Sequence, residues 1–234
     1  MDAVKGSGTH HGTHHGKRPD KRAERSRRTR EKIITAARDL FIAQGYGATS
    51  LQEVADRAGV AVQTVYFVFR NKRALFKDVV DTSIAGDTEP VATMERDWFR
   101  AACAEPTAAG QLRAHVRGVR AIQERVAPVI PLIAAAAATD PEIAAQWPTG
   151  PEDPRYTVQH AAAQALTSKP DARPGVGTTR AADLLYGLLS PELYLIFVRD
   201  RGWSPDAWEE WARTTLTAQL CTGHERDAAR SERP

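Results

Sequence analysis

Two short helix signals joined by a tight turn constrain this chain more than any other feature. The stretch TSLQEVADRAGV, residues 49–60, opens with a capping box, in which the side chains of Ser50 and Glu53 each bond a free backbone N–H group of the other. Gly59 ends the segment, because glycine readily adopts the positive φ of a helix end. Apolar residues recur between them at helical spacing: Leu51, Val54, Ala55 and Ala58.

The next stretch, VQTVYFVF (residues 62–69), has a composition typical of a β-strand. The helical signals on both sides favour a helix instead, because tertiary packing can offset a propensity cost of about half a kcal/mol per residue. In such a helix Val65 and Phe69 face the core. Two short helices joined by a glycine turn predict a helix–turn–helix. The outward side chains are then Val62, Gln63, Tyr66 and Phe67.

Two further helices complete the N-terminal unit. Apolar residues recur at helical spacing between Ile33 and Phe41, and a glycine-rich turn ends that helix. Asn71 caps another helix that begins at Lys72. We expect residues 26–80 to fold as one domain.

Charge is distributed unevenly along the 234 residues. Residues 1–80 hold 16 Lys and Arg against 8 acidic residues, a net charge of +8, whereas residues 81–234 carry a net charge of −5. A basic N-terminal third indicates a polyanionic partner such as nucleic acid, with a solvated charged tail as the alternative.

Both ends of the chain are expected to lack regular structure. We expect a flexible basic arm over residues 1–25, a first helix that begins after the basic run ends at Lys32, and a disordered tail over residues 224–234. The arm contains four histidines without an acidic or cysteine partner, so we expect no metal site there. They are His10, His11, His14 and His15.

Several classes of protein are disfavoured. The two cysteines, Cys103 and Cys221, have no C-x-x-C spacing, which indicates a reducing, cytoplasmic setting. No apolar run reaches 18 residues and the N-terminus lacks a secretory signal, so we expect no membrane span and no membrane partner. The chain has no G-x-S-x-G, no H-E-x-x-H and no phosphate-binding glycine loop, so we expect neither an enzyme nor a cofactor.

Beyond residue 80 the pattern predicts helices alone. The run LYLIFV, residues 193–198, is apolar on every side of a helix and has to be covered all round. Proline at position 191 is expected to kink or split the helix that contains it. The expected helices lie between Pro90 and Pro106, over 107–126, 128–138, 155–168 and 178–200, and after Ser204-Pro205.

Residues 30–80 resemble the TetR family of bacterial transcriptional regulators. The resemblance implies an all-α fold, with an N-terminal three-helix helix-turn-helix DNA-binding domain and a C-terminal helical ligand-binding and dimerisation domain over residues 81–223. It implies a homodimeric repressor that binds a double-stranded DNA operator and is released by a small-molecule effector. The motifs that carry it are Gly45-Tyr46-Gly47, Thr49-Ser50, Ala58-Gly59-Val60, Thr64-Val65-Tyr66 and Asn71-Lys72.

The resemblance also assigns residues to DNA. Gln63 can bond adenine through two hydrogen bonds, and apolar neighbours can contact thymine methyl groups. Many members carry a histidine where this chain has Val68, so we expect no phosphate hydrogen bond there. The expected phosphate contacts are Thr49, Ser50, Tyr66 and Lys72. The expected base-facing residues are Ala61, Val62, Gln63, Thr64 and Phe67.

In the C-terminal domain, aromatic and amphipathic side chains are the candidates for an effector pocket, although most of them are expected to be core residues. The last two helices resemble the family's dimer interface, with purely internal packing as the alternative. A DNA-binding regulator without an effector, controlled by a partner or architectural in role, is the alternative function. The pocket candidates are Met94, Trp98, Phe99, His115, Trp147, Tyr156, His160 and Tyr186.

Overall fold

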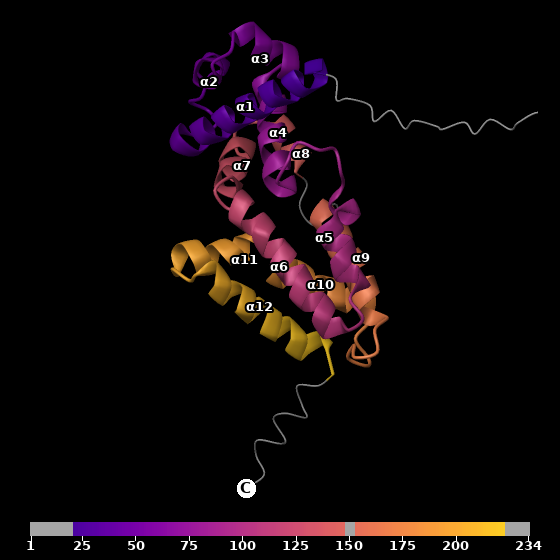
Figure 1. Cartoon of the computed structure of the whole chain (residues 1–234). Coiled ribbons are helices and arrows are strands. Elements are labelled where there is room, and N and C mark those ends of the chain that lie inside the picture. The colour runs from indigo at the N-terminus through magenta and orange to yellow at the C-terminus, as the bar shows by residue number, and fades with distance from the viewer. Residues whose placement is uncertain (1–20, 148–152, 223–234) are drawn as a thin grey trace, which may run out of the picture.

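The computed structural model describes residues 21–147 and 153–222, which form helices joined by loops, with no β-strand among them (Figure 1). This confirms the all-α expectation. The predicted tail at residues 224–234, the histidine cluster and residues 1–20 of the predicted arm lie outside the described residues.

Four helices form the N-terminal unit, and they follow the predicted segments except at the start of the first. Their buried side chains share one core that includes Phe41, Val54 and Phe76. The strand-like stretch is helical, which confirms the predicted helix–turn–helix. The helices are α1 (Lys21–Gln44), α2 (Leu51–Ala58), α3 (Val62–Phe69) and α4 (Lys72–Ala85).

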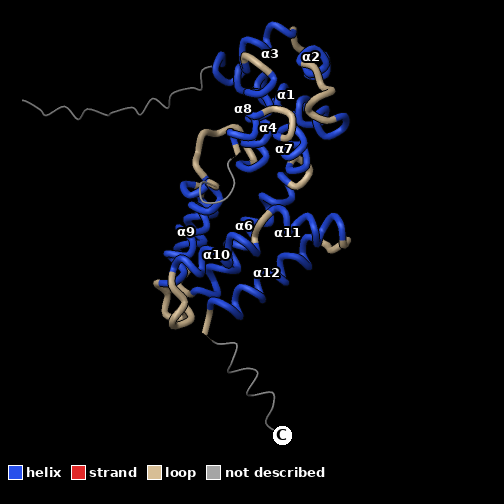
Figure 2. Tube along the Cα trace, turned by 180° about the vertical axis from the view of Figure 1, so that it is seen from behind, coloured by secondary structure: helices blue, strands red, loops and turns tan. Residues whose placement is uncertain are grey.

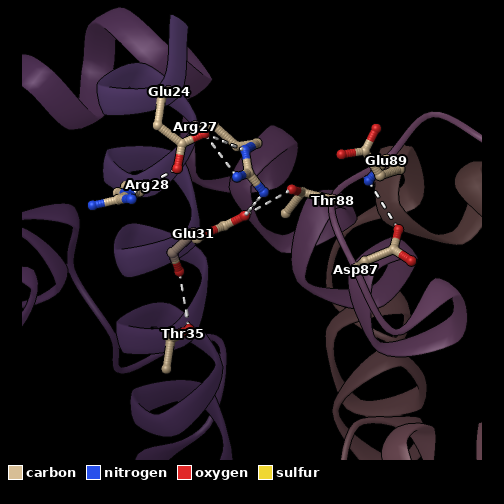
Figure 3. Close-up of polar contacts among 8 residues, drawn as sticks. All are labelled: Glu24, Arg27, Arg28, Glu31, Thr35, Asp87, Thr88 and Glu89. Atoms are coloured by element: carbon tan, nitrogen blue, oxygen red, sulfur yellow. Dashed lines mark hydrogen bonds and ion pairs between the residues drawn. The ribbon is translucent and has the colours of Figure 1, made fainter. Parts of the chain in front are cut away.

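The first helix begins at Lys21, inside the segment that was expected to be flexible, and this corrects the predicted arm. Ion pairs along the helix surface stabilise its polar first turns. Glu24 pairs with Arg27 and with Arg28, in each case at 2.8 Å, and Arg27 pairs with Glu31 at 3.2 Å (Figure 3). Pairs of opposite charge at these spacings favour the helical conformation. Apolar periodicity does not mark a helix of this kind.

The helices of the C-terminal unit surround a separate core that includes Leu112, Leu185 and Trp208. The long helix after Thr107 and the final helix capped by Ser204 agree with the prediction. The elements are η1 (Thr93–Glu95), α5 (Asp97–Ala104), α6 (Ala108–Val126), α9 (Pro154–Thr167), α10 (Thr178–Leu188), α11 (Pro191–Leu195), η3 (Ile196–Asp200) and α12 (Pro205–Leu220).

The expectation of one helix between Pro90 and Pro106 was wrong. A 3-10 turn and the shorter helix α5, which begins at Asp97, take its place. Between them Arg96 is extended, and its guanidinium donates to the Asp87 carboxylate at 2.7 and 3.1 Å. This contact with an earlier part of the chain holds the intervening segment as a loop.

The segment around Pro191 splits, as predicted. Ser190 begins the second part, because its hydroxyl accepts the N–H of the third helical residue at 3.2 Å. By length and composition alone Thr178–Asp200 could cross a membrane. Its two parts pack into the C-terminal core instead, with Leu185 and Tyr194 buried.

A helical hairpin from the middle of the chain packs on the N-terminal unit. It consists of α7 (Ile130–Ala137) and α8 (Pro141–Gln146), and Arg73 of α4 pairs with Asp140 at 2.6 Å. This corrects the expected boundary, which assigned the whole of residues 81–223 to the C-terminal domain. The hairpin residues buried in the N-terminal core are Val129, Ala136 and Ile143.

The molecule is elongated, with α1–α4 at one end and α10 and α12 toward the other, and α6 runs between them (Figures 1 and 2). Arg125, near the end of α6, donates from Nε to the Ser83 carbonyl at 3.0 Å and from Nη2 to the Ile84 carbonyl at 2.9 Å. These carbonyls belong to the last turn of α4. This contact ties α6 to the helix that follows α3.

Candidate nucleic-acid interface

Helix α3 presents one side to the core and the other to solvent, as predicted. Val65 and Phe69 are buried, whereas 53% of Tyr66 and 88% of Phe67 are exposed. An aromatic side chain left almost wholly in water gains nothing from folding, because its apolar area stays hydrated. The exposure of Phe67 therefore marks a surface that is suited to contact another molecule.

The start of α3 carries the other expected base-facing residues. Ala61 is the N-cap and, like Gln63, is exposed, whereas Val62 and Thr64 are half-buried. The helix spacing sets Phe67 one turn beyond Gln63 on the same face. In helix–turn–helix proteins the first residues of the second helix contact base edges. The base contacts of these four residues and of Phe67 stay a prediction.

A rare backbone conformation ends α3. Arg70 has a φ of +64°, a value that residues other than glycine seldom adopt, and its N–H donates to the Tyr66 carbonyl at 2.8 Å. Its side chain is exposed. Residues 61–69 contain no charged side chain, so Arg70 is the first cation after the base-facing surface. Arg70 is not among the residues that the sequence predicted to contact DNA.

The turn before α3 forms as predicted. The backbone N–H of Ser50 donates to Glu53 Oε2 at 2.7 Å, the N–H of Glu53 donates to Ser50 Oγ at 3.2 Å, and Gly59 has a φ of +67°. Hydrogen bonds from Ser50 lower the pKa of the Glu53 carboxyl. The Ser50 hydroxyl also donates to that carboxylate at 2.8 Å, so its phosphate contact stays a prediction.

Thr49 has a different role from the one expected. Its side chain is buried, and its hydroxyl donates to the Gly45 carbonyl at 2.8 Å and accepts from Gln44 Nε2 at 3.3 Å. A buried hydroxyl with these partners closes the turn between α1 and α2. We therefore correct the expected phosphate contact of Thr49.

Lys72 is also engaged within the protein. Its ammonium donates to the carbonyls of Tyr46 at 2.9 Å, Gly47 at 3.3 Å and Thr49 at 3.0 Å, and it lies 4.4 Å from the centre of the Tyr46 ring. Burial lowers the pKa of Lys72. An ammonium group has three N–H donors, and these carbonyls take all three. The expected phosphate contact is therefore corrected to a structural one.

Exposed cations gather at the start of α1. In Figure 1 this end of α1 lies beside α3. Arg30 connects the two helices, because its guanidinium lies 5.0 Å from the centre of the Phe69 ring and pairs with Asp78 of α4 at 2.6 Å. The uneven charge of the sequence was the signal for this basic end. The exposed basic residues there include Lys21, Arg25 and Arg28.

The eight pocket candidates do not share one site. Trp147 stacks edge-on against Phe76 in the N-terminal core, with ring centres 5.7 Å apart, and Met94 is exposed on η1. These two expectations are corrected. The other six form two clusters in the C-terminal unit: Trp98, Phe99 and His115, and Tyr156, His160 and Tyr186.

The first cluster has buried polar atoms without protein partners. His115 Nε2 lies 2.8 Å from Gln159 Oε1, and Gln111 Nε2 donates to the Ala162 carbonyl at 2.7 Å. Within the described part of the chain, His115 Nδ1 and Gln111 Oε1 have no hydrogen-bond partner. Burial lowers the pKa of His115 and favours its neutral form. The sequence analysis missed both glutamines, although polar residues at inner positions of a helix are a usable signal.

The second cluster is polar and partly exposed. Tyr186 donates to Asp153 at 2.7 Å, and Tyr156 donates to Asp183 at 3.0 Å. Both hydroxyls are thus satisfied inside the protein. A surface cavity of about 560 Å³ lies elsewhere, between α6 and α12, and is lined mainly by charged residues such as Arg120. None of the eight candidates lines it.

Comparisons with known proteins agree with the geometry of the N-terminal unit. Residues 33–79 match the family model described as bacterial regulatory proteins, tetR family. The HTH-type transcriptional repressor BdcR of Escherichia coli is 34% identical over 67 residues, which are 29% of this chain and 34% of BdcR. The chain spans between 34% and 59% of the length of the curated relatives that it matches.

Solved structures extend the likeness to the C-terminal unit. A TetR-family transcriptional regulator from Mesorhizobium loti has a TM-score of 0.64 at 24% identity, over 85% of this chain and 99% of that one. The complex of Stenotrophomonas maltophilia SmeT with triclosan has a TM-score of 0.66 at 18% identity, over 84% and 93%. At such identities the likeness concerns the fold. The N-terminal unit thus belongs to the TetR family of bacterial transcriptional regulators, which is a family of regulators rather than enzymes.

Proposed function

We propose that the protein binds a specific sequence in double-stranded DNA and represses transcription from it. The observation that carries this proposal is the outer side of α3, where Gln63 and Phe67 are exposed on a helix that Val65 and Phe69 fix to the core. Such a helix can enter the major groove, where each base pair presents a distinct pattern of donors, acceptors and methyl groups. We infer repression rather than activation from the relative BdcR, which is described as a repressor. The function implies a cytoplasmic location, beside the bacterial chromosome.

Selection of bound duplexes from a random pool tests this function. We expect one enriched, roughly palindromic sequence, with half-sites one helical turn or a multiple apart. Gln63→Ala should cost about 1–3 kcal/mol and relax the preference at one position. Gln164→Ala, at an exposed position of α9, is the matched control and should change nothing. A pool without any enriched sequence would refute sequence-specific binding.

We also propose that two copies associate through α10–α12. In η3 and in the loop before α12, 48% of Ile196 and 36% of Trp203 are exposed, although both are large apolar residues. Phe197 packs between Trp203 and Trp211, with ring centres 4.6 and 4.7 Å apart, and so extends the apolar surface. Sedimentation should give the mass of two chains, and Ile196→Glu should shift the equilibrium toward one. A single-chain mass for the unaltered protein at micromolar concentration would contradict the proposal.

The proposed release by an effector rests on the first aromatic cluster. His115 Nδ1 and Gln111 Oε1 are buried acceptors without donors, and a ligand with N–H or O–H groups would satisfy them. Through the contact of Arg125 with α4, a change in the position of α6 on ligand binding would reach the DNA-binding unit. SmeT, which shares the fold, has been solved with the phenol triclosan.

Titration with a panel of aromatic alcohols and amines tests effector release, with operator affinity as the readout. An active compound should lose its effect in Gln111→Leu, which removes one of the two acceptors, and keep it in Gln164→Leu. If no compound shifts the affinity of the protein for DNA, a regulator without an effector is the better description.

A further inference from the structure

We propose that α3 recognises the C5-methyl groups of pyrimidines, so that the operator is bound through thymine methyl groups and 5-methylcytosine can take their place. The inference rests on the proposed DNA-binding function and names the chemical feature that this surface selects. It also predicts a form of regulation, because methylation of cytosine at a suitable position would strengthen binding.

The chemistry of the exposed surface points to methyl groups. Phe67 is the most exposed of the large apolar residues in the described part of the chain, at 88%. Ala61 and Val62 precede it at the start of the same helix and add further apolar area. In the major groove, the C5-methyl group is the apolar feature that a base pair offers to such side chains.

The same surface lacks the groups that select guanine. Guanine is most often recognised by arginine or lysine at O6 and N7. Residues 61–69 carry neither, and Lys72 donates to three carbonyls of its own chain. Arg70 follows the last residue of α3, and its φ of +64° turns the backbone out of the helix there.

One polar side chain remains to fix the register. Gln63 is exposed one turn before Phe67 on the same face. Its amide can bond N6 and N7 of adenine, and the methyl group of the paired thymine lies on the same major-groove edge of that base pair. The pair of residues is therefore suited to steps rich in A·T pairs, in which Gln63 bonds adenine and Phe67 covers a methyl group.

The size of the effect follows from the burial of one methyl group. Burying one such group contributes about 0.8 kcal/mol, and 1.4 kcal/mol corresponds to a tenfold change in Kd. We therefore expect about a fourfold loss of affinity for each contacted methyl group that is removed.

Four duplexes that differ at one position of the enriched half-site isolate the methyl group. Replacing T·A by U·A removes the methyl group and keeps every hydrogen-bonding group. Replacing C·G by 5-methylcytosine·G adds only that group. We expect both methylated forms to bind about fourfold more tightly than their partners at a position that faces Phe67.

Two variants assign the effect to its residue. In Phe67→Ala the affinity ratio between the T·A and U·A duplexes should fall to about one, and this variant should fold because its side chain is exposed, which circular dichroism checks. In Gln63→Ala the ratio should persist while the preference for adenine is lost. A ratio that persists in Phe67→Ala would overturn the assignment to this residue.

The failure of the inference and the failure of the proposed function are distinguishable. An enriched operator whose affinity changes less than about 1.5-fold when each thymine in turn is replaced by uracil would overturn methyl recognition and leave DNA binding intact. A methyl effect at thymine but none at cytosine would overturn the proposed acceptance of 5-methylcytosine. The absence of any enriched operator would refute the proposed function itself.

Discussion

Lys72 offers the clearest test of whether a cation of the DNA-binding unit stabilises the fold or contacts a DNA phosphate. In the structure its ammonium donates to the carbonyls of Tyr46, Gly47 and Thr49 and so ties the start of α4 to the turn between α1 and α2. Lys72→Met keeps an unbranched apolar stem and removes all three donors. The turn then loses the group that holds it against α4.

The magnitude follows from the three contacts. A hydrogen bond to a charged group contributes about 1.5–3 kcal/mol, but one of the three carbonyls is exposed and gains water when the lysine is removed. We therefore expect Lys72→Met to lower the free energy of unfolding by about 2–4 kcal/mol. Lys77→Met is the matched control, because Lys77 is exposed on the same helix and pairs with Asp81 at the surface. It should cost about 0–1 kcal/mol.

Two measurements separate the structural role from a phosphate contact. Urea unfolding gives the change in stability, and the dependence of operator affinity on salt gives the number of phosphates that the protein neutralises. For a structural lysine the folded Lys72→Met variant keeps the slope of the unaltered protein. A stability loss below about 0.5 kcal/mol together with a slope reduced by about one would refute our assignment.

Two further predictions concern the C-terminal core. Because burial lowers the pKa of His115 below its ordinary value of 6.5, the unfolded chain takes up a proton first as the pH falls, so stability should decline below pH 6.5 by up to about 1.4 kcal/mol per pH unit. In urea titrations, His115→Gln should reduce the dependence of the free energy of unfolding on pH. His160→Gln, at an exposed position, is the control and should leave it unchanged. An equal dependence on pH in both variants would contradict the prediction. Gly118→Ala should destabilise the protein by about 1 kcal/mol, because the new Cβ would lie 2.2 Å from a ring carbon of Trp98. In a Trp98→Leu background the same change should be neutral or stabilising, since alanine favours a helix more than glycine does.

Local signals in the sequence predicted the helix–turn–helix correctly. The capping box of Ser50 and Glu53, the positive φ of Gly59 and the cap at Asn71 each involve residues within a few positions of one another, so their chemistry is visible in the sequence. The orientation of α3 followed for the same reason, because helical spacing alone separates Phe67 from Phe69.

The wrong predictions concern residues whose conformation or partners depend on contacts outside their local sequence. Arg96 and Asp87 hold a loop where periodicity favoured a helix, and no local pattern reports such a pair. The expected phosphate contacts of Thr49 and Lys72 failed because their partners are backbone carbonyls, which the sequence does not distinguish from one another. The buried acceptor of Gln111 was missed because its significance depends on α9 packing against α6.

The hairpin α7–α8 has a consequence for how regulators of this kind can be recombined. The family match ends at residue 79, but Ile143 and Trp147 cover the core around Phe76. A chimera that joins α1–α4 to a foreign sensor directly after α4 would expose that core to water and fold poorly. A transplantable DNA-binding module therefore has to include residues 129–147, so the exchangeable unit is discontinuous in the gene although it is continuous in space.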